Sequence, residues 1–170
     1  LRLVEVGPAH TRGDVLVYVP SDRVLYTGDI LFNGGHPAIW AGPPSNWVKA
    51  CDLMLSWDLE TVVPGHGPVT DKHGIREFRD YLAYIIAQSR RCYDEGMSFE
   101  QAADTISLDR WAHLAESERL YINIYSCYRE FSGGELPKPD FMYLYQLMAK
   151  RHFRHHPEHC QEPGCSHHGH

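Results

Sequence analysis

The chain changes character near residue 73, and this change limits the folds that it can form. Before that point, short apolar runs alternate with turns rich in Gly and Pro, whereas stretches with helical periodicity follow it. The first part predicts a helix over 46–57 that begins at Ser45, a hairpin turn at Pro20-Ser21-Asp22, and strands over 1–6, 15–19, 23–27 and 61–63. We therefore expect an α/β fold.

The second part of the chain predicts helices. Ser98 precedes Gln101 by three residues, a capping-box pattern that opens a short helix, and Gly96 ends the helix before it. The expected helices cover 72–95, 98–106, 116–131 and 140–150. The chain then divides into an α/β part, a helical extension and a mobile tail rich in His and Cys, over residues 1–73, 74–151 and 152–170.

Composition excludes several classes of function. A formal net charge of −6 argues against a nucleic-acid partner, because binding to phosphates needs a basic surface. No apolar run is long enough to span a membrane, so we expect no membrane partner. The five cysteines form no recognisable disulfide framework, which favours a reducing compartment, and we expect a cytoplasmic protein.

Three short segments each place a metal-binding side chain beside Gly or Pro, just beyond an expected strand. They are Gly7-Pro8-Ala9-His10-Thr11, Thr27-Gly28-Asp29-Ile30-Leu31-Phe32 and Pro64-Gly65-His66-Gly67-Pro68. Loops that leave rigid strand ends can hold side chains in fixed mutual positions. Imidazole nitrogen and carboxylate oxygen suit zinc, and one carboxylate can bridge two ions. We therefore take His10, Asp29 and His66 as candidate metal ligands.

In this order, the three segments resemble the second half of the metallo-β-lactamase fold, an αββα sandwich of two sheets between helices. The resemblance implies that His10 completes one metal site, that His66 binds a second metal, and that Asp29 bridges both as a catalytic residue. It implies two zinc ions in the complete protein, with iron or manganese as alternatives. It also implies a metal-bound hydroxide that attacks an ester, thioester, lactam or phosphoester in a small-molecule substrate.

The resemblance covers residues 1–73 and lacks one part of the family pattern. A His-x-His-x-Asp-His segment, which supplies two ligands to each metal in this family, lies upstream of these motifs, and the chain has none. We expect this chain to be the C-terminal part of a metallo-hydrolase, carrying half of the metal ligands. A second chain or a homo-oligomer could instead supply the other half, or the chain could be a non-catalytic, degenerate half-fold that assembles with another chain.

The remaining candidates each have a simpler alternative. His36 and Trp40 follow Asp29 and could touch substrate, but a solvent-facing loop suits His36 and packing suits Trp40. Asp14 suits a role in its turn. A rival function is metal handling through the tail, where most of the twelve histidines lie. The candidate ligands there are His159, Cys160, Cys165 and His167.

Overall fold

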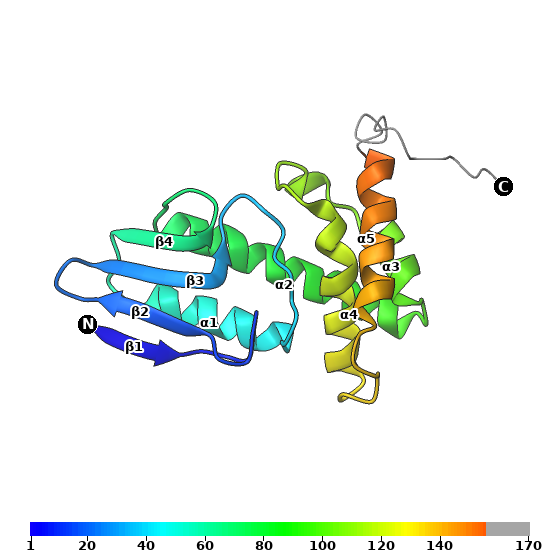
Figure 1. Ribbon diagram of the computed structural model, residues 1–170, viewed down its shortest axis with the longest axis horizontal. Coiled ribbons are helices and arrows are strands. Elements are labelled where there is room, and N and C mark those ends of the chain that lie inside the picture. Colours follow the sequence, from blue (N-terminus) through cyan, green and yellow to red (C-terminus); the bar gives the residue numbers. More distant parts are fainter. Residues whose placement is uncertain (156–170) are drawn as a thin grey trace.

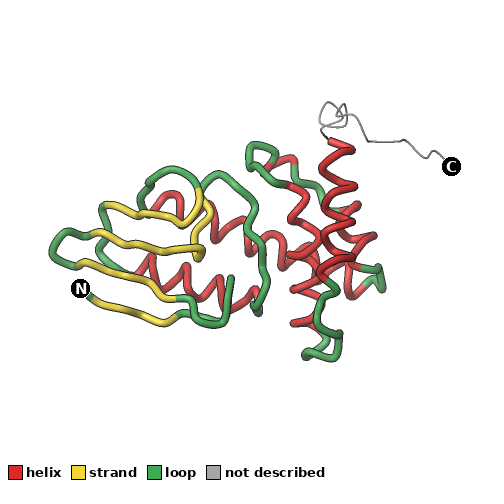
Figure 2. The backbone as a smooth tube through the Cα atoms, in the orientation of Figure 1, coloured by secondary structure: helices red, strands yellow, loops and turns green. Residues whose placement is uncertain are grey.

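The computed structural model describes residues 1–155 and has a mixed α/β architecture, as predicted. A sheet lies at one end of the molecule and a group of helices at the other (Figures 1 and 2). The elements are β1 (Arg2–Glu5), β2 (Val15–Val19), β3 (Val24–Phe32), α1 (Pro44–Ser56), β4 (Thr61–His66), α2 (Lys72–Asp94), α3 (Phe99–Thr105), η1 (Asp109–Trp111), η2 (Ser117–Arg119), α4 (Leu120–Phe131) and α5 (Phe141–His155).

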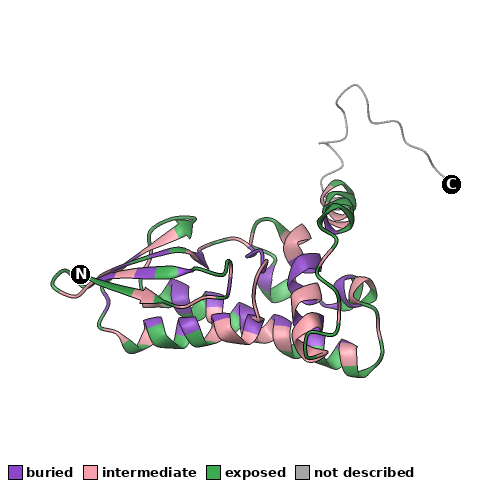
Figure 3. Cartoon of the chain, turned by 60° about the horizontal axis from the view of Figure 1, so that its bottom comes forward, coloured by how far each residue is buried: buried purple, intermediate pink, exposed green. Residues whose placement is uncertain are grey.

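The sheet has four strands in the order β1-β2-β3-β4. The first two pairings are antiparallel and follow from short connections, whereas β3 and β4 are parallel. A parallel pair needs a crossover, and α1 supplies it. Helices α1 and α2 cover one face of the sheet, with buried residues gathered between the two layers (Figures 1 and 3).

The strands alternate between a buried row and an exposed row. Leu25 pairs with Tyr18 and Val62, and all three are buried on the helix side of the sheet. The next row is also apolar but faces away from the helices, and it consists of Leu3, Val17, Tyr26 and Val63. Leu3 is 67% exposed and Tyr26 is 47% exposed. Within residues 1–155 the sheet therefore has a second apolar face that nothing covers, which we call the outer face.

Helix α2 joins the two parts of the molecule. Its Phe78 ring packs near Trp47 of α1 and Phe32 of β3, while its later turns contact α3 and α4. The predicted capping box opens α3, since Ser98 Oγ accepts from the Gln101 amide and the Gln101 side chain accepts from the Ser98 amide. The helical extension thus packs onto an element that also covers the sheet.

Several predicted boundaries were wrong. β3 ends at Phe32 and β4 at His66, because each extends along the other, with Gly28 opposite Pro64 and Phe32 opposite His66. Pro64 does not stop β4, since an edge strand tolerates a residue that lacks an amide hydrogen. Helix α1 begins at Pro44 rather than after Ser45, whose amide donates to Glu130.

The C-terminal boundaries also differ from the prediction. The expected 116–131 helix is replaced by η2 and α4: Glu116 has a left-handed φ of 64° and lies before η2, and α4 begins at Leu120. Helix α5 runs to His155, so the first residues of the expected tail belong to a helix instead. The candidate tail ligands His159, Cys160, Cys165 and His167 lie outside the described residues. No helix within residues 1–155 is long and apolar enough to cross a membrane.

Candidate metal centre

His10, Asp29 and His66 converge at the edge of the sheet. One carboxylate oxygen of Asp29, Oδ2, lies 3.4 Å from Nε2 of His10, and the other, Oδ1, lies 3.4 Å from Nε2 of His66. The carboxylate therefore stands between two imidazoles and faces each with a separate oxygen. Asp29 lies within β3 and His66 ends β4, so two of the three side chains come from strands rather than from the loops that the sequence predicted.

The parallel pairing of β3 and β4 places Asp29 beside His66. The backbone also holds the pair from behind, since the Asn33 amide donates to the His66 carbonyl at 2.9 Å. Two glycines next to His66 allow this approach. A Cβ at Gly65 would overlap Oδ1 of Asp29, and one at Gly67, where φ is +86°, would overlap the Asn33 carbonyl. The Gly-His-Gly sequence is therefore a steric requirement of the site.

Asp14 organises the loop that carries His10. Its carboxylate accepts hydrogen bonds from the amides of Ala9 at 3.0 Å and Thr11 at 2.9 Å, and from the Thr11 hydroxyl. Asp14 is buried, so these bonds are shielded from water. Asp14 thus has the turn role that the sequence predicted. Its hydrogen bonds to Ala9 and Thr11, which we call the Asp14 clamp, fix the backbone on both sides of His10.

The ring of His10 is oriented by a backbone carbonyl. Its Nδ1 lies 2.9 Å from the carbonyl oxygen of Ala38, which can only accept, so Nδ1 carries the hydrogen. In the neutral ring, Nε2 then presents a lone pair to Oδ2 of Asp29. Two acceptors that face each other call for a proton or a cation between them, and a carbonyl at Nδ1 is the usual partner of a metal-binding histidine.

Phe32 forms the apolar wall behind both histidines. Its ring stacks on His66 with centroids 4.3 Å apart and lies 5.7 Å from the His10 ring. The side chain of His10 is only 14% exposed, whereas those of Asp29 and His66 are 44% and 49% exposed. The site is therefore closed on the His10 side and open on the other side, where further ligands or a substrate could approach.

The arrangement fits half of a two-metal site. Ligand atoms about 2.0–2.2 Å from a tetrahedral zinc ion lie about 3.3–3.6 Å from each other, and both Nε2-to-Oδ distances in the site are 3.4 Å. Each candidate ion would thus have two ligands from this chain, with Asp29 shared. Within residues 1–155, no three or more His, Cys, Asp or Glu side chains gather around one point as a complete metal site would require.

His36 does not face solvent, which corrects one of the alternatives for it. The residue is fully buried, its amide donates to the Ala115 carbonyl, and its Nδ1 lies 2.6 Å from the Tyr81 hydroxyl. Burial, together with the positive charges of Arg151 and Arg119, lowers the pKa of His36 from 6.5 to about 4.

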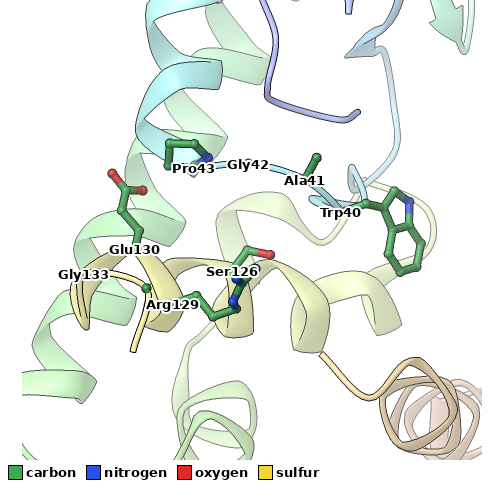
Figure 4. A pocket seen from close by; sticks show the side chains of 9 residues that line it. Trp40, Ala41, Gly42, Pro43, Ser126, Arg129, Glu130 and Gly133 are labelled. Atoms are coloured by element: carbon green, nitrogen blue, oxygen red, sulfur yellow. The ribbon is translucent and has the colours of Figure 1, made fainter. Parts of the chain in front are cut away.

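Trp40 lines a surface hollow of about 210 Å³ between the 40–43 loop and α4, away from the candidate metal ligands (Figure 4). The hollow is lined by Ser126, Arg129 and Glu130, and its lining includes none of the three candidate ligands. The Trp40 ring packs near Phe141 and Tyr145 of α5, at 5.6 and 6.0 Å. Packing therefore accounts for the position of Trp40.

Sequence reasoning missed Arg119 as a neighbour of the site. Its guanidinium lies 5.6 Å from the centroid of Phe32, the ring that stacks on His66, and donates to the His36 carbonyl at 3.0 Å. Arg119 also forms an ion pair with Glu116. No local sequence pattern marks Arg119 as part of the site, because Arg119 in η2 lies 87 residues after Phe32 at the end of β3 (119 − 32).

Comparison with known proteins agrees with the fold. Residues 1–66, less than half of the chain, match the family model described as the metallo-beta-lactamase superfamily. Among curated proteins, it is 25% identical over 119 residues to the linear primary-alkylsulfatase of Pseudomonas sp. (strain ATCC 19151), covering 64% of this chain and 22% of that protein. It is 34% identical over 56 residues to the hydroxyacylglutathione hydrolase of Thermosynechococcus vestitus, covering 33% of this chain and 22% of that protein.

The chain spans about a fifth of the length of these curated relatives. Solved structures share its fold at low identity. The sec-alkylsulfatase Pisa1 from Pseudomonas sp. superposes with a TM-score of 0.62 at 16% identity, over 92% of this chain and 30% of that one. A metallo-beta-lactamase family protein from Thermus thermophilus superposes with a TM-score of 0.56 at 14% identity, over 78% of this chain and 44% of that one.

Proposed function

We propose that this chain is the C-terminal part of a two-metal hydrolase, in which His10 and His66 each hold one ion and Asp29 bridges them. The observation that carries the proposal is the position of Asp29, one oxygen facing each imidazole at 3.4 Å. The ions, zinc by this donor set or else iron or manganese, would supply Lewis acidity and activate water. The Ala38 carbonyl orients the His10 ring and Asp14 holds the neighbouring Ala9 amide, so this ligand is positioned by the chain itself.

The missing ligands would come from a segment that covers the outer face of the sheet. That face is apolar across all four strands, from Leu3 to Val63, and its exposure costs free energy that a covering layer would recover. An upstream half of the same protein is the occupant that the relatives favour, because they are about five times longer than the matched part. A second chain or a second copy of this one would meet the same requirement.

The substrate would be a small molecule with an ester-type bond. The two curated relatives are named as an alkylsulfatase and a hydroxyacylglutathione hydrolase, and these names support hydrolysis without choosing among ester, thioester, lactam and phosphoester. Within residues 1–155, the cysteines Cys51, Cys92 and Cys127 are buried and free, which favours a reducing compartment such as the cytoplasm. The negative net charge makes a nucleic-acid partner unsuitable.

Calorimetric titration with zinc tests the ligand assignment. A chain ending at residue 155 removes the tail donors, and it should still bind zinc weakly through the three loop and strand ligands. Asp29→Ala should abolish this binding, since the carboxylate is shared by both half-sites, whereas Asp22→Ala, in the exposed hairpin turn, should not change it. Unchanged zinc binding in Asp29→Ala would refute the site, and loss of all zinc on tail removal would favour metal handling by the tail.

A second candidate function, a non-catalytic half-fold that assembles with another chain, is favoured by the outer face alone. Multi-angle light scattering of the full chain addresses it. A stable dimer that dissociates when Tyr26 is replaced by Lys would support self-assembly through this face. A monomer at all concentrations would exclude self-assembly and leave the upstream half or another chain as the occupant.

A further inference from the structure

A cavity of about 620 Å³ lies where the 33–37 loop, the η1 and η2 turns and helix α5 meet. His36, Trp111 and Arg151 line it, together with Asp109, Glu116 and Ser117. The residues come from three separate stretches of the chain, so the cavity is a product of the tertiary structure. Its lining includes none of the candidate metal ligands His10, Asp29 and His66.

Three of the lining residues carry a buried polar atom with no hydrogen-bond partner. The atoms are Nε2 of His36, Nε1 of Trp111 and Nε of Arg151. Leaving a buried donor without a partner costs free energy, so buried polar groups are normally satisfied. Only five such side-chain atoms occur in the described part of the chain, and three of them belong to the wall of this one cavity.

All three atoms are hydrogen-bond donors. Arginine and indole nitrogens can only donate. The tautomer of His36 is assigned from its neighbours: the Tyr81 oxygen accepts from Nδ2 of Asn123 at 3.4 Å, and Nδ1 of His36, at 2.6 Å, is the acceptor for the Tyr81 hydroxyl hydrogen. The hydrogen of the neutral ring is then on Nε2, and the lowered pKa of His36 keeps the ring neutral near pH 7.

The charges around His36 favour an anion. Arg151, Arg119 and His113 are the groups whose fields act on its ring, and all three lower its pKa, as positive charge does. Glu116 and Arg119 form an ion pair and offset each other, and Asp109 lies in η1, so Arg151 is the lining residue whose positive charge would attract the anion. A ligand that only accepts hydrogen bonds and carries negative charge matches both the donors and the field.

We propose that this cavity binds a small organic molecule through an oxyanion group, a carboxylate, sulfate or phosphate, which accepts hydrogen bonds from His36, Trp111 and Arg151. The volume lies within the range of ligand pockets, about 300–1,000 Å³. The site is separate from the proposed metal centre, yet the 33–37 loop connects it directly to Phe32, the ring that stacks on His66. Binding there would fix the loop that leaves β3.

The indole hydrogen of Trp111 provides a direct test. The ¹⁵N-labelled full chain, which has four tryptophans, is titrated separately with sodium sulfate, phosphate and acetate, with sodium chloride at matched ionic strength as a reference. The Trp111 indole signal, assigned by Trp111→Phe, should move saturably with at least one oxyanion and not with chloride. The Trp47 indole, which already donates to the Ile30 carbonyl at 2.7 Å, is the internal control and should stay in place.

Substitution of the cationic donor completes the test. Arg151→Met should weaken the anion affinity about tenfold or more, as expected for loss of a charged hydrogen-bond donor, while Arg91→Met, on the exposed end of α2, should leave it unchanged. The proposal fails if no oxyanion moves the Trp111 signal, if chloride moves it equally, or if Arg151→Met keeps full affinity. Should Arg151→Met not fold, the titration of the unsubstituted chain decides alone, because an unresponsive Trp111 signal overturns the proposal.

Discussion

Gly65 lies directly against the carboxylate of Asp29, so closely that a Cβ at position 65 would overlap Oδ1 of that side chain. The contact follows from the parallel pairing of β3 and β4. It means that the geometry of the candidate metal centre depends on a residue that has no chemistry of its own.

Gly65→Ala should displace the Asp29 carboxylate. We expect a loss of about 1–3 kcal/mol in the free energy of unfolding, because the methyl group must push backbone and side chain apart, together with weaker zinc binding. Urea unfolding and zinc titration measure the two effects. Gly13→Ala is the matched control, since a Cβ there would meet nothing within 4 Å. Equal behaviour of the two variants would contradict the steric requirement.

Asp14→Ala should loosen the loop that carries His10. The amides of Ala9 and Thr11 would lose their acceptor inside the protein, at a cost of about 1–3 kcal/mol in unfolding free energy. Zinc affinity should fall about 10- to 100-fold, the usual effect of removing a group that orients a ligand. Asp58→Ala, at an exposed position, is the control. A variant that loses stability but keeps zinc affinity would show that the clamp does not position His10.

The buried imidazole of His36 should make the protein less stable in acid. Its pKa is lowered from 6.5 to about 4, chiefly by burial, so the unfolded chain binds this proton more readily than the folded one. The contribution of the neutral His36 ring to the free energy of unfolding is therefore present above pH 6.5 and is lost as the pH falls towards 4. The total loss is about 3 kcal/mol. Urea unfolding at pH 7 and pH 4 measures it.

Two variants isolate this contribution of His36. His36→Gln should reduce the difference in unfolding free energy between the two pH values, because it removes the titrating ring. His73→Gln, whose ring is 72% exposed in the wild type, should leave the difference unchanged. The same pH dependence in the wild type and in His36→Gln would show that His36 is not buried as a neutral ring.

Tyr26→Lys should weaken whatever association covers the outer face of the sheet. A charge in the middle of an apolar row would be buried without a partner when the covering layer binds, whereas in the free chain the side chain is 47% exposed and tolerates the change. Tyr145→Lys, a change of a similarly exposed tyrosine (52%) on α5, is the control. Sedimentation velocity or binding to the upstream half should show a loss only for Tyr26→Lys. Loss of association in Tyr145→Lys alone would place the contact on α5 instead.

The local pattern predicted most helices well, since their signals lie within a few neighbouring residues. The capping box at Ser98 and the start of α2 after Asp71 are examples, because the cap and the amides that it satisfies are adjacent in sequence. The ends of β3 and β4 were missed because they depend on pairing between strands that are far apart along the chain. Arg119 and the cavity at His36 were missed for the same reason.

The sequence by itself determined the donors and their order, His10, Asp29 and His66, and the glycines that a close approach requires. These features are chemical identities and local steric freedoms, which a residue carries wherever the chain goes. Only the tertiary structure decided that one carboxylate stands between two imidazoles, that His36 is buried against Tyr81, and that an apolar sheet face is left uncovered within residues 1–155. Distances between residues dozens of positions apart are set by strand pairing and layer packing, which depend on the whole chain at once.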